Sequence, residues 1–563
     1  MHSNRFPMLE QELSDAFLKL QQQIYYENSD LHLRAELADF VGKNPEIQLR
    51  NLAKRIQRRD KPYFERLCRK IGIHVYPKGI SNGDNAGHNT NPNFISNAVY
   101  GKACEVSRLA IFGALPLELH LIAVLWIMRH GYRLDEDLAD NNYGNRLALQ
   151  QGVLPRGRLL FKPYIQQYKA WWSNGLQIAR EYLDRKKDIT IASFDLKDYY
   201  HRVELDFDEV EKKIFRKGAR PGSHFIHVVF KMIHQHYARA FRDIGHPATL
   251  SGGRTDRYPL PIGMQSSFVL ANWYLRKMDR FIVDRMAPLY YGRYVDDILI
   301  VLNVKTTTAV SRADIVRTTE YFGKYGIKPP DEINQMHSFI SKYLSNLICP
   351  RASGPGNGFN YAIQIKGLAN QLLQEEKLFI YQFDGRLSAG IVNKFVEDQQ
   401  KRSSEFRFLS DEEDENFEDF DEYFFGDNLD VDELNKARFK IVEENKFKLS
   451  VYLAKLIQRK MERGSGYKPE EEKKVSVYFK GAFLIKHYIF WEKLFTLYVA
   501  AGNKDLFVQL HSDIDKAIAS LTYTGEIKMT ALTIRSDLRQ YLRYALEMAL
   551  GLRPEFLSPG EIS

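Results

Sequence analysis

The sequence predicts an α+β fold in which a sheet-containing region precedes a helical one. Strand-like apolar runs, separated by stretches of helical pattern, occur at three places: 188–194, 294–302 and 361–365. This mixture is typical of an α+β layer. After Pro355, apolar residues recur at helical spacing in three stretches: 439–457, 475–500 and 532–550. The final part of the chain is therefore expected to be all helical.

At 563 residues the chain is longer than one compact core, so several domains are expected. Taken in order, we predict a mostly helical region over 1–190, a sheet-containing region over 191–350 and a helical domain over 351–563. Within the first region, the Gly- and Asn-rich stretch 77–92 is expected to be a loop, and a strongly apolar helix is expected over 115–128.

The net charge of +9 is unevenly distributed along the chain. Residues 411–433 contain 13 acidic residues and no Lys or Arg, which predicts an exposed acidic loop near 410–433. The rest of the chain is correspondingly more basic. A basic body suits a polyanionic partner such as nucleic acid, although an ordinary solvated surface has the same composition.

The cysteines and the hydropathy pattern bear on location. Three widely spaced cysteines predict neither a disulfide framework nor a zinc site, which fits a reducing compartment. The first residues lack an apolar secretory core, and no stretch of about 18 uncharged apolar residues exists. We therefore expect a cytoplasmic protein without a membrane span.

Two adjacent carboxylates, Asp296 and Asp297, lie inside an apolar run that begins at Tyr294 and ends at Leu302. Like charges side by side resist burial, and they become useful when a divalent cation neutralises them. The run therefore predicts a β-hairpin that carries two acids into a metal site.

A third acid, Asp195, ends the strand-like run 188–194 and is expected to face the same space as Asp296. Such a set suits nucleotidyl transfer, in which a hydroxyl attacks the α-phosphate of a nucleoside triphosphate and two metal ions stabilise the attacking and leaving oxygens. Mg²⁺ needs only a few carboxylates beside water and phosphate. We predict Asp195, Asp296 and Asp297 as catalytic metal ligands, the Leu196 carbonyl as an added ligand, and Mn²⁺ as an alternative to Mg²⁺.

Two further elements have both a functional and a structural interpretation. The ring of Tyr200, five residues after Asp195, would lie beneath the sugar and exclude a 2′-hydroxyl, or it simply packs a helix start. Residues 260–267 read Leu-Pro-Ile-Gly-Met-Gln-Ser-Ser, which predicts a tight turn before a helix capped by Ser266 or Ser267. That turn would lie along the incoming base and the template, or it is an ordinary capped helix.

These elements, in this order, resemble motifs A, B and C of reverse transcriptases. The matching features are an Asp with an aromatic at the fifth position after it, a Leu-Pro-x-Gly turn with a downstream Ser, and Tyr-x-Asp-Asp. The resemblance covers about residues 75–350. It implies a right-hand polymerase core, with the fingers in 1–190, the palm in 191–350, dNTPs as substrates and DNA as the product. It also assigns the sugar gate to Tyr200 and the base-positioning turn to Gly263 and Ser267.

Triphosphate binding also needs cations, which the family carries on the fingers. Lys102 and Arg108 have about the expected spacing, Lys78 and Arg146 are other choices, and a solvated surface is the ordinary fate of each. Tyr-Gly-Ile at 325–327 with the following Lys looks like a weak motif D.

The turn departs from the family pattern at Ile262, where the family commonly has Gln. The residues before the core, at 117–127, 143–147 and 161–164, are similar to bacterial abortive-infection and related unknown-group defence reverse transcriptases. That resemblance implies antiphage defence and a C-terminal helical-repeat domain. It also implies DNA synthesis that, in some members, is untemplated and primed on a protein hydroxyl, often in a homo-oligomer.

Three alternatives remain at this point. The first is a strictly RNA-templated enzyme that uses a dedicated noncoding RNA. The second belongs to another class: a catalytically silent scaffold that binds nucleic acid through its basic body. The third is a palm-like nucleotide cyclase, although such enzymes lack the Leu-Pro-x-Gly turn.

Overall fold

The structure is a computed structural model that describes most of the chain. The described residues are 5–26, 30–80, 104–215, 222, 224–248, 256–305, 309–353, 358–386, 446–462 and 469–557. Three predictions fall outside these ranges, namely the acidic loop near 410–433, the cation Lys102 and the loop over 77–92 beyond residue 80. The loop prediction is wrong for 77–80, because those residues pair with a neighbouring strand as the end of β1 (Gly72–Ile80).

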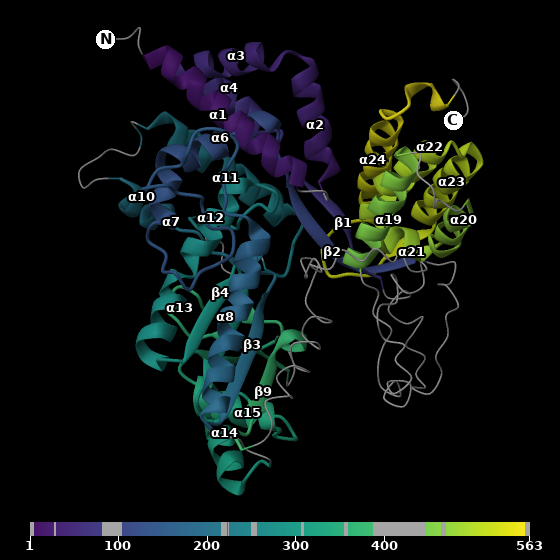
Figure 1. Cartoon of the computed structure of the whole chain (residues 1–563). Coiled ribbons are helices and arrows are strands. Elements are labelled where there is room, and N and C mark those ends of the chain that lie inside the picture. Colours follow the sequence, from purple (N-terminus) through teal and green to yellow (C-terminus); the bar gives the residue numbers. More distant parts are fainter. Residues whose placement is uncertain are drawn as a thin grey trace.

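Four helices open the described chain, in the region predicted to be mostly helical: α1 (Arg5–Tyr26), α2 (Leu31–Gly42), α3 (Pro45–Gln57) and α4 (Lys61–Cys68). The side chains of Asp30, Asn44 and Asp60 cap the last three by accepting hydrogen bonds from backbone N–H groups of the first turn. Figure 1 shows these helices in purple at the top of the molecule.

A small sheet connects the two ends of the chain. Its order is β1-β2-β10, and its strands are β1 (Gly72–Ile80), β2 (Cys104–Ala114) and β10 (Leu521–Tyr523). β1 and β2 are antiparallel, whereas β10 pairs in parallel with the start of β2. In Figure 1 these strands lead from the N-terminal helices to the C-terminal ones, and β1 contacts both α21 (Ala482–Lys486) and α24 (Ala531–Leu550).

The larger sheet has seven strands among the described residues, in the order β4-β5-β3-β8-β7-β6, with β9 also paired to β3. Their bounds are β3 (Ile189–Lys197), β4 (Tyr290–Tyr294), β5 (Asp297–Leu302), β6 (Ile348–Ala352), β7 (Phe359–Ile363), β8 (Leu372–Leu373) and β9 (Phe379–Phe383). The predicted strands correspond to β3, to the β4–β5 hairpin and to β7. β3 is flanked by β5 on one edge and by β8 and β9 on the other.

Helix α8 (Tyr164–Asp184) covers one face of this sheet. Trp171, Trp172 and Leu176 of the helix belong to one buried cluster with Ile191 of β3 and Leu299 of β5. These contacts place α8 along the central strands, as Figure 1 shows. Burial of large aromatic side chains there stabilises the strands that carry the predicted acids.

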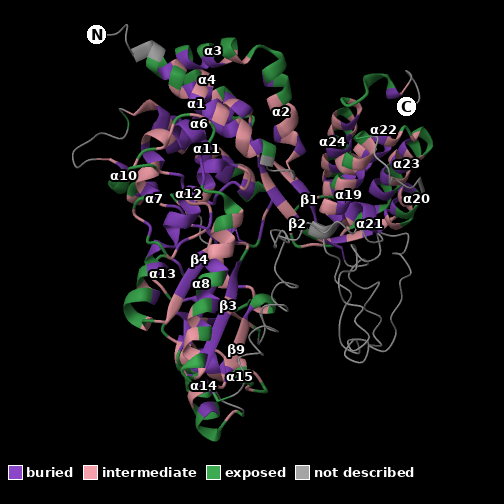
Figure 2. Ribbon diagram, in the orientation of Figure 1, coloured by how far each residue is buried: buried purple, intermediate pink, exposed green. Residues whose placement is uncertain are grey.

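The remaining helices before residue 345 surround the sheet and the N-terminal helices. They are α6 (Leu117–Trp126), η1 (Ile127–Gly131), α7 (Tyr132–Asp135), α9 (Tyr199–Arg202), α10 (Phe207–Ile214), α11 (Phe225–Asp243), α12 (Gln265–Tyr274), α13 (Arg276–Phe281), η3 (Ile282–Met286), α14 (Arg312–Lys324), α15 (Gln335–Phe339) and η4 (Ile340–Leu344). The predicted apolar helix over 115–128 is confirmed as α6. All its residues except Glu118 are buried, because other helices surround it (Figure 2).

The C-terminal part is mainly helical among the described residues. It contains α19 (Lys446–Met461), α20 (Pro469–Tyr478), α21 (Ala482–Lys486), η7 (Tyr488–Phe490), α22 (Trp491–Ala501), α23 (Lys504–Ser520), α24 (Ala531–Leu550) and η8 (Pro554–Phe556). These helices correspond to the stretches of helical spacing in the sequence.

The prediction that helix begins at residue 351 is wrong for 359–383. Those residues form β7, β8, η5 (Glu375–Lys377) and β9. The boundary at 351 in fact falls inside β6, which pairs with β7. The physical reason is backbone pairing: β8 and β9 hydrogen-bond to β3, so 359–383 complete the larger sheet.

A single large cluster of buried apolar side chains extends from α1 to the C-terminal helices. Figure 2 shows this core in purple, with exposed residues on the outer faces of the helices. Within the described ranges, no helix is both long and apolar enough to cross a membrane.

Candidate active site

The pairing of β3 with β5 brings two of the predicted acids together. Asp195 of β3 lies directly opposite Asp297 of β5 in the antiparallel register. Directly opposite residues on such strands have Cβ atoms about 4.5–5.5 Å apart. Asp296 precedes Asp297 at the β4–β5 turn, so all three acids lie at one end of the sheet. Asp195 is buried, whereas Asp296 and Asp297 are partly exposed.

The turn that carries Asp296 is conformationally strained. Val295 has a φ of 58°, in the left-handed region that a β-branched residue rarely adopts. Such a conformation costs about 1–3 kcal/mol and persists only where the surroundings enforce it. The residues around Val295 therefore have to hold the turn in place.

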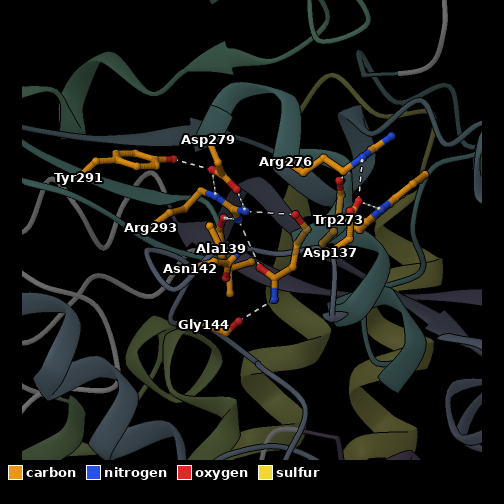
Figure 3. A network of polar contacts seen from close by, with 12 residues as sticks. Asp137, Ala139, Asn142, Gly144, Trp273, Arg276, Asp279, Tyr291 and Arg293 are labelled. Carbon is orange, nitrogen blue, oxygen red and sulfur yellow. Dashed lines mark hydrogen bonds and ion pairs between the residues drawn. The ribbon is translucent and has the colours of Figure 1, made fainter. Parts of the chain in front are cut away.

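The buried Arg293 provides that support. Its Nε and Nη2 donate to the carboxylate of Asp279 at 2.8 and 2.7 Å, and Tyr291 Oη donates to the same carboxylate. Its Nη1 donates to the carbonyl oxygen of Val295 at 2.6 Å and to Asn272 Oδ1 at 3.2 Å. Figure 3 shows Arg293 and Tyr291 converging on Asp279. The strained turn is thus tied to α12 and α13.

A close backbone contact holds the other side of the turn. A Cβ atom added to Gly144 would lie 2.6 Å from the backbone nitrogen of Val295, so only glycine fits there. The Gly144 carbonyl accepts a hydrogen bond from Asn272 Nδ2 at 2.6 Å (Figure 3). Tyr143 N–H donates to the Arg293 carbonyl at 2.8 Å. The segment before α8 therefore packs directly on the hairpin.

The pKa values of Asp296 and Asp297 are raised by their surroundings. Burial and then the neighbouring Asp195 raise the pKa of Asp297 from 3.8 to about 7. Burial, Asp195 and Asp297 likewise hold the pKa of Asp296 well above its usual value. Repulsion of this kind favours a nearby cation.

Lys377 of η5 is such a cation, and no sequence pattern points to it. Its Nζ donates to Asp195 Oδ2 at 2.5 Å. Its positive charge offsets part of the rise in the pKa of Asp296 and Asp297. It lies 182 residues after Asp195. The surrounding Glu-Glu-Lys sequence has no distinctive pattern that would have revealed this role.

The acids fit a divalent cation in part. The second carboxylate oxygen of Asp195, Oδ1, is buried and has no hydrogen-bond partner among the described residues. However, nowhere in the described ranges are three or more His, Cys, Asp or Glu side chains arranged closely enough to coordinate a metal as they stand. Mg²⁺ commonly takes only one or two carboxylates and completes its shell with substrate phosphates and water. The carboxylate set suits a site of that kind.

Tyr200 lies beside the acids. It follows Asp198, which has a φ of 49°, and begins the short helix α9 with Tyr199. Burial and the nearby Asp296 raise the pKa of the Tyr200 hydroxyl well above its usual value. Its ring lies 6.3 Å from that of Phe268 on α12. Tyr200 therefore lies near Asp296 and near the helix that follows the predicted turn.

The predicted turn forms, but its helix cap differs from the prediction. Gly263 has a φ of 98°. The N-cap of α12 is Met264, and no side chain caps it. Instead, Ser267 Oγ donates to the Pro261 carbonyl at 2.7 Å, which closes the turn from within. The expected cap by Ser266 or Ser267 is therefore wrong, because the helix begins before those residues and the Ser267 hydroxyl points back toward Pro261.

Among the described residues, the cations that were predicted to bind the triphosphate do not contact the three acids. Arg108 lies exposed on β2, where its side chain crosses Gly79 of β1, and it makes no ion pair with any described residue. Arg146 is committed to Asp135 and to backbone carbonyls. Lys102 lies outside the described residues.

The remaining predicted positions have structural partners. The Leu196 backbone pairs with Leu373 of β8, beside Asp195. In the weak motif D, Tyr325 Oη donates to Gln364 Oε1, and Lys328 forms an exposed ion pair with Asp331.

Part of the chain matches a known protein family. Residues 141–332 match the family described as reverse transcriptase (RNA-dependent DNA polymerase). The chain contains a reverse transcriptase domain. A domain of this kind supports nucleotidyl polymerase activity on nucleotide and nucleic-acid substrates, and its family generally uses divalent metal ions. The match includes Asp195, Asp296 and Asp297 but ends before Lys377. No curated protein matches the chain.

Proposed function

We propose that this chain is a DNA polymerase of the reverse transcriptase family that adds dNTPs at the site formed by Asp195, Asp296 and Asp297. The observation that carries the proposal is the direct pairing of Asp195 with Asp297 inside a matched reverse transcriptase domain. The raised pKa values of Asp296 and Asp297 support it, since perturbed acids cluster at functional sites.

The three carboxylates, with the Leu196 carbonyl, would hold Mg²⁺ or Mn²⁺. When bound, such ions stabilise the attacking 3′-oxygen and the leaving pyrophosphate oxygen. Asp195 has an unpaired oxygen for this purpose, and the Arg293 network fixes the backbone that presents Asp296. The protein's own task is therefore to fix the positions of the acids.

Neighbouring residues would bind and select the nucleotide. Tyr200 would exclude the 2′-hydroxyl, which is supported by its proximity to Asp296 and to Phe268. The turn around Gly263 and Ser267 would lie against the base. Arg108 and Lys102 would contact the triphosphate from the fingers.

Nucleic acid is the partner that the charge distribution supports. Residues 50–70 contain nine cations and two acids, and all nine cations are exposed on or beside α3 and α4. They are Arg50, Lys54, Arg55, Arg58, Arg59, Lys61, Arg66, Arg69 and Lys70. Such a surface suits a phosphate backbone.

The cellular role that we propose is antiphage defence in the bacterial cytoplasm, by a homo-oligomer with a fingers–palm core and a C-terminal helical domain. Its support is the resemblance to abortive-infection and unknown-group enzymes at 117–127, 143–147 and 161–164. That resemblance also favours untemplated, protein-primed synthesis. An RNA-templated reaction with a dedicated noncoding RNA is the second candidate, since the family description itself names an RNA-dependent polymerase.

The test incubates the purified full chain with each labelled dNTP and Mg²⁺, without added nucleic acid. We expect incorporation that Asp296→Asn lowers by about 10³-fold or more, because a metal ligand is lost. Asp331→Asn, which removes an exposed acid at a surface ion pair, is the matched control and should behave as wild type. Normal incorporation by Asp296→Asn would refute the proposal.

The product separates the alternatives. A labelled band that migrates with the polypeptide, with a homopolymer or random sequence, supports untemplated self-primed synthesis. A reproducible complement of a copurifying RNA supports the templated reaction. Salt-sensitive nucleic-acid binding with no dNTP turnover under any condition supports the scaffold instead.

A further inference from the structure

The segment that carries Lys377 is held against the catalytic strand on both sides. β8, just before η5, pairs with the end of β3, and β9, just after it, pairs with the first half of β3. Between them, Gln374 N–H donates to the Asp195 carbonyl at 2.9 Å. Strand pairing therefore fixes the backbone of Lys377 beside Asp195, although the residue lies outside the matched reverse transcriptase domain.

The lysine ammonium serves as the counter-ion of the three acids. It contacts Asp195 Oδ2 directly, and its field reaches Asp296 and Asp297. Burial disfavours a charged amine, yet the carboxylates outweigh burial and raise the pKa of Lys377. The ammonium thus occupies one of the two oxygens that Asp195 would offer to a metal ion.

The side chain of Lys377 is able to leave this position. It is 46% exposed, whereas the side chain of its partner Asp195 is 10% exposed. By contrast, the Arg293 side chain at the other edge of the site is fully buried. Movement of the Lys377 ammonium would therefore break one ion pair without disturbing the core.

We propose that Lys377 is a displaceable counter-ion: its ammonium holds Asp195 until a divalent cation arrives with a nucleoside triphosphate, and it then moves to the triphosphate. This inference rests on the proposed function. A divalent cation alone has to break the Lys377–Asp195 ion pair without replacing it. A nucleotide-bound cation offers the released ammonium new phosphate oxygens as partners. Metal and nucleotide should consequently favour each other's binding, and this coupling is reciprocal.

The experiment measures Mn²⁺ binding to the full-length protein by electron paramagnetic resonance, which reports free Mn²⁺. Titrations are made with and without an α,β-methylene dNTP, which cannot react at the α-phosphate. The proteins are wild type, Lys377→Met, which keeps the side-chain length, and Asp296→Asn, which marks binding at other sites. Circular dichroism melting shows whether each variant is folded.

Lys377→Met should bind Mn²⁺ about tenfold more tightly than wild type without nucleotide, because no ammonium competes for Asp195. With the analogue present, the difference should shrink or reverse, so the gain that nucleotide gives to Mn²⁺ affinity falls. The matched control is Lys197→Met, since Lys197 is an exposed lysine on the same strand, two residues from Asp195. It should show the wild-type coupling, which separates the specific contact from the change in net charge.

Two results would overturn the inference while leaving the proposed function intact. One is a Lys377→Met affinity for Mn²⁺ that equals or falls below the wild-type value without nucleotide, with binding still dependent on Asp296. The other is an equal gain in affinity in Lys377→Met and Lys197→Met, which would reflect net charge alone. If wild type shows no Asp296-dependent Mn²⁺ binding with or without the analogue, the proposed function fails and this inference fails with it.

Discussion

The two edges of β3 carry different parts of the candidate site. Along one edge, β5 places Asp297 opposite Asp195, and a buried arginine and a close glycine contact lock the adjoining turn. Along the other edge, β8 and β9 present a half-exposed lysine to the same Asp195. The site therefore combines acids in fixed positions with a cation on a half-exposed side chain.

Removal of the buried Arg293 guanidinium should disturb the turn between β4 and β5. Arg293→Met leaves Asp279 charged and buried, which typically costs 3–5 kcal/mol of folding free energy. It also deprives the Val295 carbonyl of its donor, so dNTP incorporation should fall about 10²-fold or more. Denaturant unfolding and incorporation assays measure the two effects.

A second variant separates stability from positioning at this edge. In Arg293→Met with Asp279→Asn, the uncompensated charge is gone, so part of the stability should return. Incorporation should stay low, because the turn still lacks its donor. Full recovery of activity in the double variant would show that Arg293 matters for folding alone.

A methyl group at the close contact should push the hairpin away. Gly144→Ala places a Cβ 2.6 Å from the Val295 nitrogen, and overpacking of this kind costs about 1–3 kcal/mol. Incorporation should fall about tenfold with it. Gly323→Ala on α14 is the control, since nothing lies within 4 Å of its added Cβ and helix propensity should make it slightly stabilising. Equal effects of the two substitutions would contradict the claim that the close contact between Gly144 and Val295 holds the turn in place.

The acids on β3 and on the β4–β5 hairpin were largely predictable from sequence, and the reasons are physical. Carboxylates inside apolar runs violate hydrophobic patterning, so Asp195, Asp296 and Asp297 stand out even in a single chain. The strand before Asp195 and the hairpin of the other two follow from the same runs. The structure adds their register, which sequence patterning alone does not determine.

The other edge of β3, formed by β8 and β9, was not predictable from sequence for an equally physical reason. β8 has two residues and β9 has five, too few for a clear alternation, so the sequence predicts helix rather than strand over 372–383. Lys377 acquires its role only through pairing with a strand 182 residues away. The partners of Arg293 were likewise hidden, because Asp279 is an ordinary helical residue in the sequence.

Protonation should control how well the acids bind a metal. The pKa of Asp297 is raised to about 7, so the carboxylate form gains population between pH 6 and 8. Apparent Mn²⁺ affinity should rise about tenfold per pH unit below pH 7 and level off above it. Asp297→Asn should flatten that dependence, and an unchanged slope in this variant would assign the titration to another group.

The same shift fixes the sign of the stability change. The folded pKa of Asp297 exceeds its unfolded value of 3.8, so the folded state binds the extra proton. The stabilisation is complete below pH 3.8 and is lost as pH rises through about 7. Metal-free protein should therefore show a smaller fall in Tm between pH 5 and pH 8 in Asp297→Asn than in wild type.

The smallest expected effect on DNA synthesis concerns Tyr200. Tyr200→Ala should leave dNTP incorporation within about threefold while raising the relative use of rNTPs about tenfold or more, because the 2′-hydroxyl gains room. Competition assays with paired dNTP and rNTP measure the ratio. Tyr325→Ala, at a partly exposed aromatic that follows α14, should leave the ratio unchanged. An unaltered ratio in Tyr200→Ala would mean that Tyr200 only packs against Phe268.

Iron-directed backbone cleavage tests most directly whether one divalent ion lies between these segments. Fe²⁺ substituted for Mg²⁺ reduces added H₂O₂ to hydroxide and a hydroxyl radical, which cuts the chain close to the bound ion, and ascorbate returns the Fe³⁺ to Fe²⁺. We expect cuts together near residues 195, 296 and 377, suppressed by excess Mg²⁺ and lost in Asp296→Asn. Cuts confined to other segments, or an unchanged pattern in Asp296→Asn, would contradict the assignment of these acids as the metal site.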